Sequence, residues 1–459
     1  MEWRLTAIAI TGVLISPFIN WAIYNAAYFP LPISPWNRKR FLLMIRNHFV
    51  ESSKQDSEEP KNDSMQSRKA NAKNNLISTS TSITETTITN PPIAARVPIL
   101  GWLWLIPEES VFGRFFWVRP MLIELLLPLG LASLYHYETT GGLLPRLALP
   151  MVDSMQLSLN LQFVCHSVLC LLMCIATFID FDERTIPDWV TIPGTILGVI
   201  LTTAASVLAP VQLWTSAEDN VTKLWPTLLD WTSPFQLVNS FSTLQQLLLG
   251  LACFAIWSFA IADRRLILRR GWRNAVKYFL AGLVRRPSWK MTAMIFAIGL
   301  SSITVSWRLL PAEAWLAGLS SLVGMAIGGL LVWAVRIIAT TAIGMEALGF
   351  GDVTLMFMVG AFLGWQPTWI AFFIAPMVAM LFVLIMFLVT GDNQLPFGPY
   401  LCVATLLTLV GWDELWNVRL QPMIEVIGFE MLILLLLGLL LMGLMLWGWR
   451  SIKLRTLNS

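Results

Sequence analysis

The stretch FIDFDERTIPD, residues 178–188, separates two long apolar runs near 157–180 and 189–210. A membrane-spanning helix needs about 20 apolar residues, so both runs can cross a bilayer and the stretch predicts the turn between two spans. Asp180 stands where the first run meets polar residues. Because a carboxylate at a membrane boundary is costly, ionisable residues in such places are often functional. The stretch therefore predicts a polytopic helical bundle and, within it, a candidate site.

Composition agrees with a membrane location. The 459 residues are 56% hydrophobic and 13% charged, whereas soluble domains carry about 25% charged residues. The 22 tryptophans suit a protein with two water–lipid interfaces. The cysteines all lie in apolar runs, which favours small core residues over a disulfide framework or a zinc site; they are Cys165, Cys170, Cys174, Cys253 and Cys402. Lipid is therefore an expected partner, and nothing points to nucleic acid.

Apolar runs recur along the chain and predict an all-α bundle of about eleven spans, the one at 353–365 being short. The runs lie near 6–27, 120–138, 157–180, 189–210, 244–262, 291–310, 315–339, 353–365, 368–390, 398–412 and 426–448. The first run has no clear cleavage site and is followed by basic residues, so it is predicted to be an anchor.

Basic residues predict one orientation for these spans. Lys and Arg cluster after the first span, in the loop 263–290 and in the tail after residue 449, whereas the loop 211–243 holds only Lys223. Since loops rich in Lys and Arg stay in the cytoplasm, the N-terminus is predicted outside and the C-terminus inside. Loop 263–290 is expected to lie on anionic lipid.

A second aspartate stands in a matching position. Asp352 closes ALGFGD, residues 347–352, directly before the run 353–365. Under the predicted orientation Asp180 ends an inward-running span and Asp352 begins an outward-running one, which places both at the cytoplasmic face. Two carboxyl groups in one site can share a proton and activate water, as in aspartic proteases. The pair therefore predicts peptide hydrolysis without a metal ion.

Each aspartate also has a purely structural interpretation. Asp352 could cap the helix that it opens, and Asp180 could pair with Arg184 one helical turn away. The neighbouring acidic residues are interpreted as solvated interface residues; they are Asp182, Glu183 and Asp188. Matching flanks around two aspartates at one face favour a site over a coincidental cap and a coincidental ion pair.

The two stretches resemble the signature motifs of bacterial type IV prepilin peptidases, membrane aspartic proteases of the Gly-x-Gly-Asp class. In that family a proline stands seven positions after the first aspartate, as Pro187 follows Asp180. The second motif is matched by Gly349, Gly351 and Asp352, and its helix ends in a similar Gly-x-x-x-Gly-Trp-Gln sequence at 360–366.

Other segments extend the resemblance. The Pro-Phe-Gly-Pro segment of the family is matched by Pro396, Phe397, Gly398 and Pro399. Residues 97–102, Arg119 and Glu124 are similar to the segment before the family's second span, and Asn20 and Tyr24 are a weaker match to the end of its first span.

Two departures qualify what the resemblance implies. Many family members bind structural zinc through two Cys-x-x-Cys pairs and also N-methylate the mature pilin, but segment 38–117 contains no cysteine. A four-cysteine zinc site is therefore impossible there, and neither zinc nor S-adenosylmethionine is expected as a cofactor. The lysine common two residues after the second aspartate is Thr354 here.

The resemblance implies four regions. They are 1–37, the first span and its exit; 38–118, a cytoplasmic segment with a degenerate zinc and methyltransferase region, whose low-complexity stretch 51–92 is expected to be disordered; 119–412, a membrane aspartic protease domain with inserted spans and the basic loop at about 240–312; and 413–459, an extra span and a cytoplasmic tail.

The resemblance also implies a function. The chain would cleave the basic leader from type IV pilin-like and pseudopilin precursors at the bacterial cytoplasmic (inner) membrane. Water would attack the peptide bond directly, with one aspartate ionised and the other protonated. The glycines of the second motif could let an extended substrate approach.

Three alternatives stay open. A presenilin-like protease would share Gly-x-Gly-Asp but would carry Tyr-Asp and Pro-Ala-Leu motifs, which the sequence lacks. A transporter would place its aspartates at the bilayer midplane rather than at its edge. A catalytically silent homologue acting as a membrane assembly factor is compatible with Thr354 and the missing cysteines.

Overall fold

The computed structural model describes most of the apolar part of the chain. The described residues are 2–28, 93–144, 152–209 apart from 154, 212–215, 222–225, 241–261, 288–343, 348–389 and 396–420, with isolated residues near 33–35 and beyond 420. The chain divides into two compact units, Met1–Leu134 and Tyr135–Ser459.

The first unit pairs two long helices and a short irregular segment. Its elements are α1 (Glu2–Ala26), the 3₁₀ helices η1 (Ile93–Arg96) and η2 (Leu100–Glu108), α4 (Glu109–Phe112) and most of α5 (Val118–Thr139). Inside this unit Asn20 of α1 donates hydrogen bonds through Nδ2 to Pro120 O and to Glu124 Oε1, both 2.9 Å long. Glu124 is buried, so this contact satisfies a polar group that would otherwise be costly between two apolar helices.

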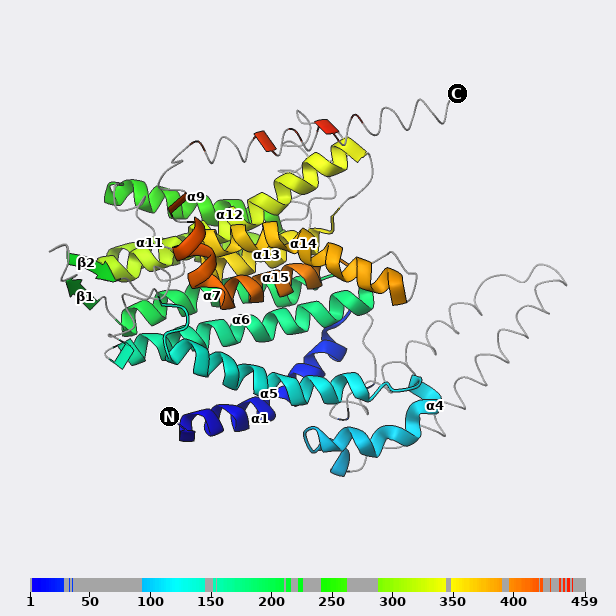
Figure 1. Ribbon diagram of the computed structural model, residues 1–459. Coiled ribbons are helices and arrows are strands. Elements are labelled where there is room, and N and C mark those ends of the chain that lie inside the picture. Colours follow the sequence, from blue (N-terminus) through cyan, green and yellow to red (C-terminus); the bar gives the residue numbers. More distant parts are fainter. Residues whose placement is uncertain are drawn as a thin grey trace, which may run out of the picture. The chain divides into compact units, whose positions relative to one another are not determined.

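The second unit is a helical bundle (Figure 1). Its elements are the end of α5, α6 (Gln156–Glu183), α7 (Asp188–Leu208), β1 (Gln212–Thr215), β2 (Thr222–Trp225), α9 (Thr243–Ile261), α11 (Ser288–Leu309), α12 (Ala312–Ile343), α13 (Phe350–Leu363), α14 (Trp365–Val389), α15 (Gly398–Val410) and the π-helical η5 (Asp413–Leu420). The two strands form one antiparallel hairpin that pairs Gln212 with Trp225.

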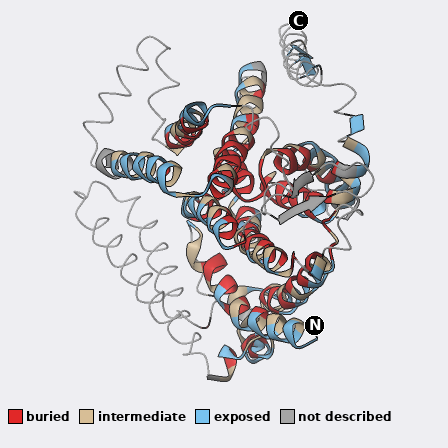
Figure 2. Cartoon of the chain, turned by 90° about the vertical axis from the view of Figure 1, so that its left-hand side faces the viewer, coloured by how far each residue is buried: buried red, intermediate tan, exposed pale blue. Residues whose placement is uncertain are grey.

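Helix α13 is the centre of this bundle. Every residue from Asp352 to Leu363 is buried, and α6, α7, α12, α14 and α15 all pack against it. The backbones of α12 and α13 meet at Gly324 and Gly360, because small residues let membrane helices approach closely. Figure 2 shows buried residues on the inward faces of the helices and exposed ones outside. The short helix α13 is therefore surrounded by five other helices of the bundle.

The all-α polytopic class is confirmed. Among the described residues, seven helices are long and apolar enough to cross a membrane, and an eighth counts if α15 and η5, bent by 81°, form one span. Helix α13 and the apolar part of α11, Ala293–Leu309, are shorter. Most of the run 426–448, the stretch 51–92 and residues 262–287 of the basic loop lie outside the described residues. The orientation and the remaining spans stay predictions.

Candidate functional site

Asp180 lies in the last turn of α6, on its buried face. Helix α6 ends at Glu183, and Arg184 follows in the left-handed conformation (φ 54°), donating its N–H to Asp180 O at 2.9 Å. This reversal turns the chain toward Pro187, the residue directly before α7. The Asp180 side chain is only 4% exposed, whereas Asp182 and Asp188 are exposed. The helix end therefore carries one aspartate inward and its acidic neighbours outward.

Asp352 lies in the first turn of α13. Gly349, extended at φ −63° and ψ 154°, occupies the N-cap position, so Asp352 is the third helical residue rather than the cap. Its carboxylate accepts a hydrogen bond from the backbone N–H of Gly349, which places negative charge at the favourable end of the helix dipole. The side chain is 6% exposed. A buried carboxylate is thus held at the start of the central helix.

The Pro-Phe-Gly-Pro segment is the third segment that contacts the site, after the end of α6 and the start of α13. Phe397 is the N-cap of α15 and Pro399 stands in its first turn. The backbone N–H of Gly398 donates a hydrogen bond to the Asp180 carboxylate. A Cβ on Gly398 would lie 2.5 Å from Asp180 Oδ2, so only glycine lets the start of α15 approach this closely. Pro396 is half-buried and leads into this contact.

Ile186 joins the three segments. It is buried in the turn between α6 and α7. A Cβ on Gly351 would lie 2.8 Å from Ile186 Cβ, and one on Gly398 would lie 2.8 Å from Ile186 Cδ1. The space beside Gly351 is therefore filled by Ile186, not left open for a substrate backbone. Gly349 has no such neighbour and is exposed.

The two aspartates share one buried environment. Their carboxyl groups interact electrostatically across the contact between α6 and α13. Asp180 Oδ2 is buried and has no hydrogen-bond partner among the described residues. A carboxylate oxygen in this condition is costly and can hold a water or a shared proton. Within the described residues no group of three His, Cys, Asp or Glu side chains could bind a metal ion.

Arg336 of α12 is a residue that the sequence interpretation missed. Its Nε donates to Leu348 O at 2.9 Å, and its guanidinium lies 5.5 Å from the centroid of the Phe350 ring. Arg336 also interacts electrostatically with Asp352. The guanidinium thus holds the glycine segment on both sides of Gly349. The available signal was an arginine inside an otherwise apolar run.

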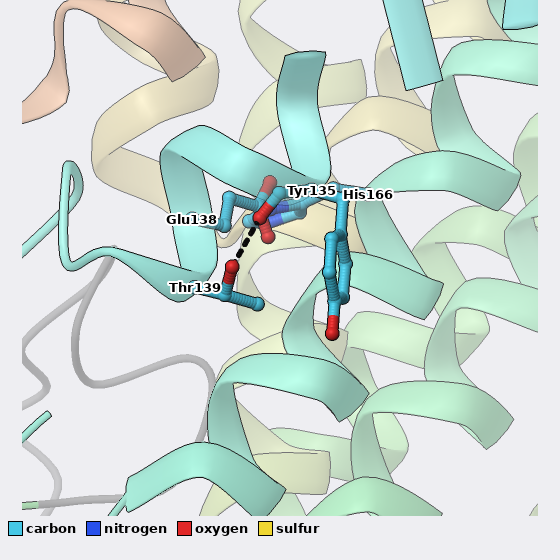
Figure 3. A network of polar contacts seen from close by, with 4 residues as sticks. All are labelled: Tyr135, Glu138, Thr139 and His166. Atoms are coloured by element: carbon cyan, nitrogen blue, oxygen red, sulfur yellow. Dashed lines mark hydrogen bonds and ion pairs between the residues drawn. The ribbon is translucent and has the colours of Figure 1, made fainter. Parts of the chain in front are cut away.

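A second buried polar cluster links the end of α5 to α6 (Figure 3). His166 Nδ1 and Glu138 Oε1 are 2.8 Å apart, and both side chains are almost fully buried. Thr139 donates its hydroxyl proton to Tyr135 O at 2.6 Å, and the Tyr135 ring meets Phe163 edge to face. This cluster lies four turns before Asp180 along α6, so it is not part of the aspartate site. Here too the signal was an ionisable residue inside an apolar run.

We expect Glu138→Ala to destabilise the bundle by about 3–5 kcal/mol, because it leaves the buried His166 without its partner. Glu138→Gln should cost much less, since the amide oxygen can still accept a hydrogen bond. Thermal unfolding of the purified protein in detergent measures both changes. Gln156→Ala, which removes a longer 3.3 Å bond to Thr139 O at the same helix contact, is the matched control and should shift the midpoint little. Equal unfolding midpoints for Glu138→Ala and Gln156→Ala would show that the contact between Glu138 and His166 does not stabilise the bundle.

Among the comparisons with known proteins, only the one with curated sequences finds matches. No family model and no solved structure matches the chain. Curated proteins named prepilin leader peptidase/N-methyltransferase do match. The one from Aeromonas salmonicida is 31% identical over 98 residues, 21% of this chain and 34% of that protein. The one from Pseudomonas aeruginosa is 31% identical over 104 residues, 22% of this chain and 36% of that protein.

A longer match is to the prepilin leader peptidase/N-methyltransferase of Aeromonas hydrophila, 27% identical over 175 residues, 35% of this chain and 57% of that protein. The chain thus spans between about a third and just over half the length of these curated relatives. The matches support a family relationship between this chain and the prepilin leader peptidases.

Proposed function

We propose that the chain is a membrane-embedded aspartic endopeptidase that removes the basic leader from type IV prepilin-like precursors. The observation that carries this proposal is the pair of buried, electrostatically interacting aspartates, Asp180 and Asp352. Among the described residues, Asp180 Oδ2 has no hydrogen-bond partner. Two carboxyl groups in one buried site are the chemical requirement for aspartic protease catalysis. The relatives named prepilin leader peptidase add support from an independent direction.

The mechanism follows from the properties of such a pair. One aspartate is ionised and accepts a proton from the attacking water, while the other is protonated and donates to the leaving amine. The pair shares its protons, so the two roles belong to the dyad rather than to one residue. The Gly398 N–H bond orients the Asp180 carboxyl, and the Gly349 N–H bond orients that of Asp352. Neither a metal ion nor a covalent intermediate is needed.

The substrate class follows from the resemblance to the prepilin peptidases, and the predicted topology agrees with it. A basic leader stays on the cytoplasmic side, so a pilin-like or pseudopilin precursor presents its cleavage site at the face where the topology places both aspartates. The protein would then act in the bacterial cytoplasmic membrane, with its substrate's hydrophobic helix in the same bilayer.

The direct test is cleavage by the purified protein. The full chain in detergent is incubated with a type IV prepilin, and the products are analysed by mass spectrometry. We expect the leader-less pilin, cut between the basic leader and the hydrophobic helix. An intact prepilin after prolonged incubation, with the protein still folded, would reject the peptidase.

A catalytically silent assembly factor is the second candidate function. Thr354, where the family has lysine, donates its hydroxyl proton to Gly351 O at 3.0 Å and supplies no positive charge. An assembly factor would bind prepilins in pull-down experiments without shortening them, which separates it from the peptidase in the same preparation.

We expect Arg336→Met to lower kcat by about tenfold to a hundredfold with little change in KM. The loss of its bond to Leu348 O frees the glycine segment, and displacing a catalytic group by about 1 Å costs rate rather than affinity. Arg336→Lys keeps the charge and should recover part of the activity. Steady-state kinetics of prepilin cleavage measures the split.

Arg308→Met is the matched control for this prediction. Like Arg336, Arg308 lies over an aromatic ring, with its guanidinium 4.6 Å from the Trp307 ring centroid, but it is exposed on α11. A kcat for Arg336→Met as high as that for Arg308→Met would show that Arg336 does not position Asp352.

The absence of the zinc-site cysteines predicts that the N-terminus of the mature pilin is not methylated. Mature pilin made by this chain alone should carry a free N-terminal amine, even when S-adenosylmethionine is added. Intact-mass measurement of the product checks this. A mass increase of one methyl group on the mature pilin would show that methyltransferase activity survives without those cysteines.

A further inference from the structure

The 3₁₀ helix η2 has two different faces. Its positions three apart lie on one side, as the 3.0-residue turn requires. Trp102, 3% exposed, and Leu105 are buried against Ala95, Phe116 and Trp117. The opposite side carries exposed apolar residues, here called the η2 apolar face: Leu100, Leu103, Trp104 (63% exposed) and Ile106.

The η2 apolar face is unusual for a surface in contact with water. Residues 97–107, VPILGWLWLIP, include no charged side chain, and charges begin only at Arg96 and Glu108. Val97 and Phe115 are exposed as well. A run of exposed apolar side chains bordered by charges marks a contact with a membrane or a partner rather than with solvent.

Two hydrogen bonds place η2 at a defined level of α5. The N–H of Ile99, directly before η2, donates to Glu124 Oε2 at 2.6 Å. Beyond the other end of η2, Trp117 Nε1 donates to Glu109 Oε1 at 2.7 Å. Glu124 lies in the second turn of α5, and Trp117 is the residue directly before that helix. Both ends of η2 are therefore tied to the start of a helix long and apolar enough to span the membrane.

The hydrogen bond between Ile99 N–H and Glu124 holds a particular backbone conformation. Ile99 has φ 65°, a conformation that a β-branched residue rarely adopts. The buried carboxylate of Glu124 holds that residue's amide and is itself held by Asn20 of α1. The position of η2 is thus built into the packing of α1 and α5 and does not depend on a free loop.

We propose that the η2 apolar face lies in the interfacial layer of the lipid bilayer, as an in-plane platform beside the start of α5. The argument for lipid is continuity: the face adjoins the first turns of a membrane span, where the acyl region begins. Tryptophan with one polar edge is favoured at this level, and a two-faced helix with apolar residues on one side lies in the interface plane. The end of the segment predicted as cytoplasmic is then membrane-bound.

The test uses the full chain in lipid vesicles and does not depend on peptidase activity. A bimane label is attached at Trp104→Cys, or at Leu100→Cys as an independent second position, and the unsubstituted protein gives the background from the buried and half-buried native thiols. Lipids with a nitroxide high on the acyl chain should quench most of the emission, and aqueous iodide should quench little. Arg96→Cys, exposed at the near end of the segment, is the control and should show the reverse.

Two results would overturn the proposal. Iodide quenching at position 104 equal to that at position 96 would place the η2 apolar face in water. Protection from both quenchers would show that protein covers the face, either another part of this chain or a second copy.

Discussion

Asp180→Asn and Asp352→Asn should each reduce prepilin cleavage at least about a thousandfold, because general acid–base catalysis by such groups contributes up to about 10⁴-fold. Asparagine keeps the size and can still accept the N–H bond from Gly398 or Gly349. It cannot exchange a proton with water or with the leaving amine. Both variants should therefore insert and accumulate normally. Product formation is followed by mass spectrometry, and thermal unfolding in detergent confirms the fold.

The first motif supplies its own controls. Asp182 and Asp188 are exposed, so Asp182→Asn and Asp188→Asn should retain most of the activity. If Asp180 and Asp352 were only structural, asparagine would be a mild change, since it serves well at helix N-termini. Full activity in either Asp180→Asn or Asp352→Asn would end the two-aspartate mechanism. Loss of activity at Asp182 alone would assign the catalytic role in the first motif to Asp182 instead of Asp180.

Gly398→Ala should lower kcat by roughly a hundredfold, which is the effect expected when a catalytic group moves by about 1 Å. The new methyl group would stand 2.5 Å from Asp180 Oδ2 and 2.8 Å from Ile186 Cδ1. Either the carboxyl or the start of α15 must move. Gly351→Ala should be harmful for the same reason, because its methyl group would meet Ile186 Cβ at 2.8 Å.

Gly349→Ala is the matched control in the same motif. Its φ of −63° suits any residue, and its nearest neighbour would be Asp352 Oδ2 at 3.5 Å. Activity should be close to that of the unsubstituted chain. Normal activity in both Gly351→Ala and Gly398→Ala would contradict the close packing around Ile186. So would a loss of activity in Gly349→Ala as large as the loss in those two variants.

The helices themselves could be predicted because membrane spans are encoded locally. A run of about 20 apolar residues is long enough to cross a bilayer, and α1, α5, α6, α7, α9, α12 and α14 all coincide with such runs. The sequence does not predict the hairpin of β1 and β2, since it lies in the loop 211–243, where no apolar run is long enough to mark a span. Ile186 carries no ionisable or catalytic group, so the sequence of the predicted turn at 178–188 does not mark it as a packing point.

The sequence by itself determined the class of the protein, the positions of Asp180 and Asp352 at the ends of apolar runs, and the relationship to the prepilin leader peptidases. It could not show which side of each helix faces inward, because a helix that is apolar all round carries no stripe to orient it. Only the tertiary structure brought Gly351 and Gly398 against Ile186, set Arg336 on the segment before Asp352, and paired Glu138 with His166. Each of these contacts joins residues of different helices or turns, so they exist only once these segments have docked.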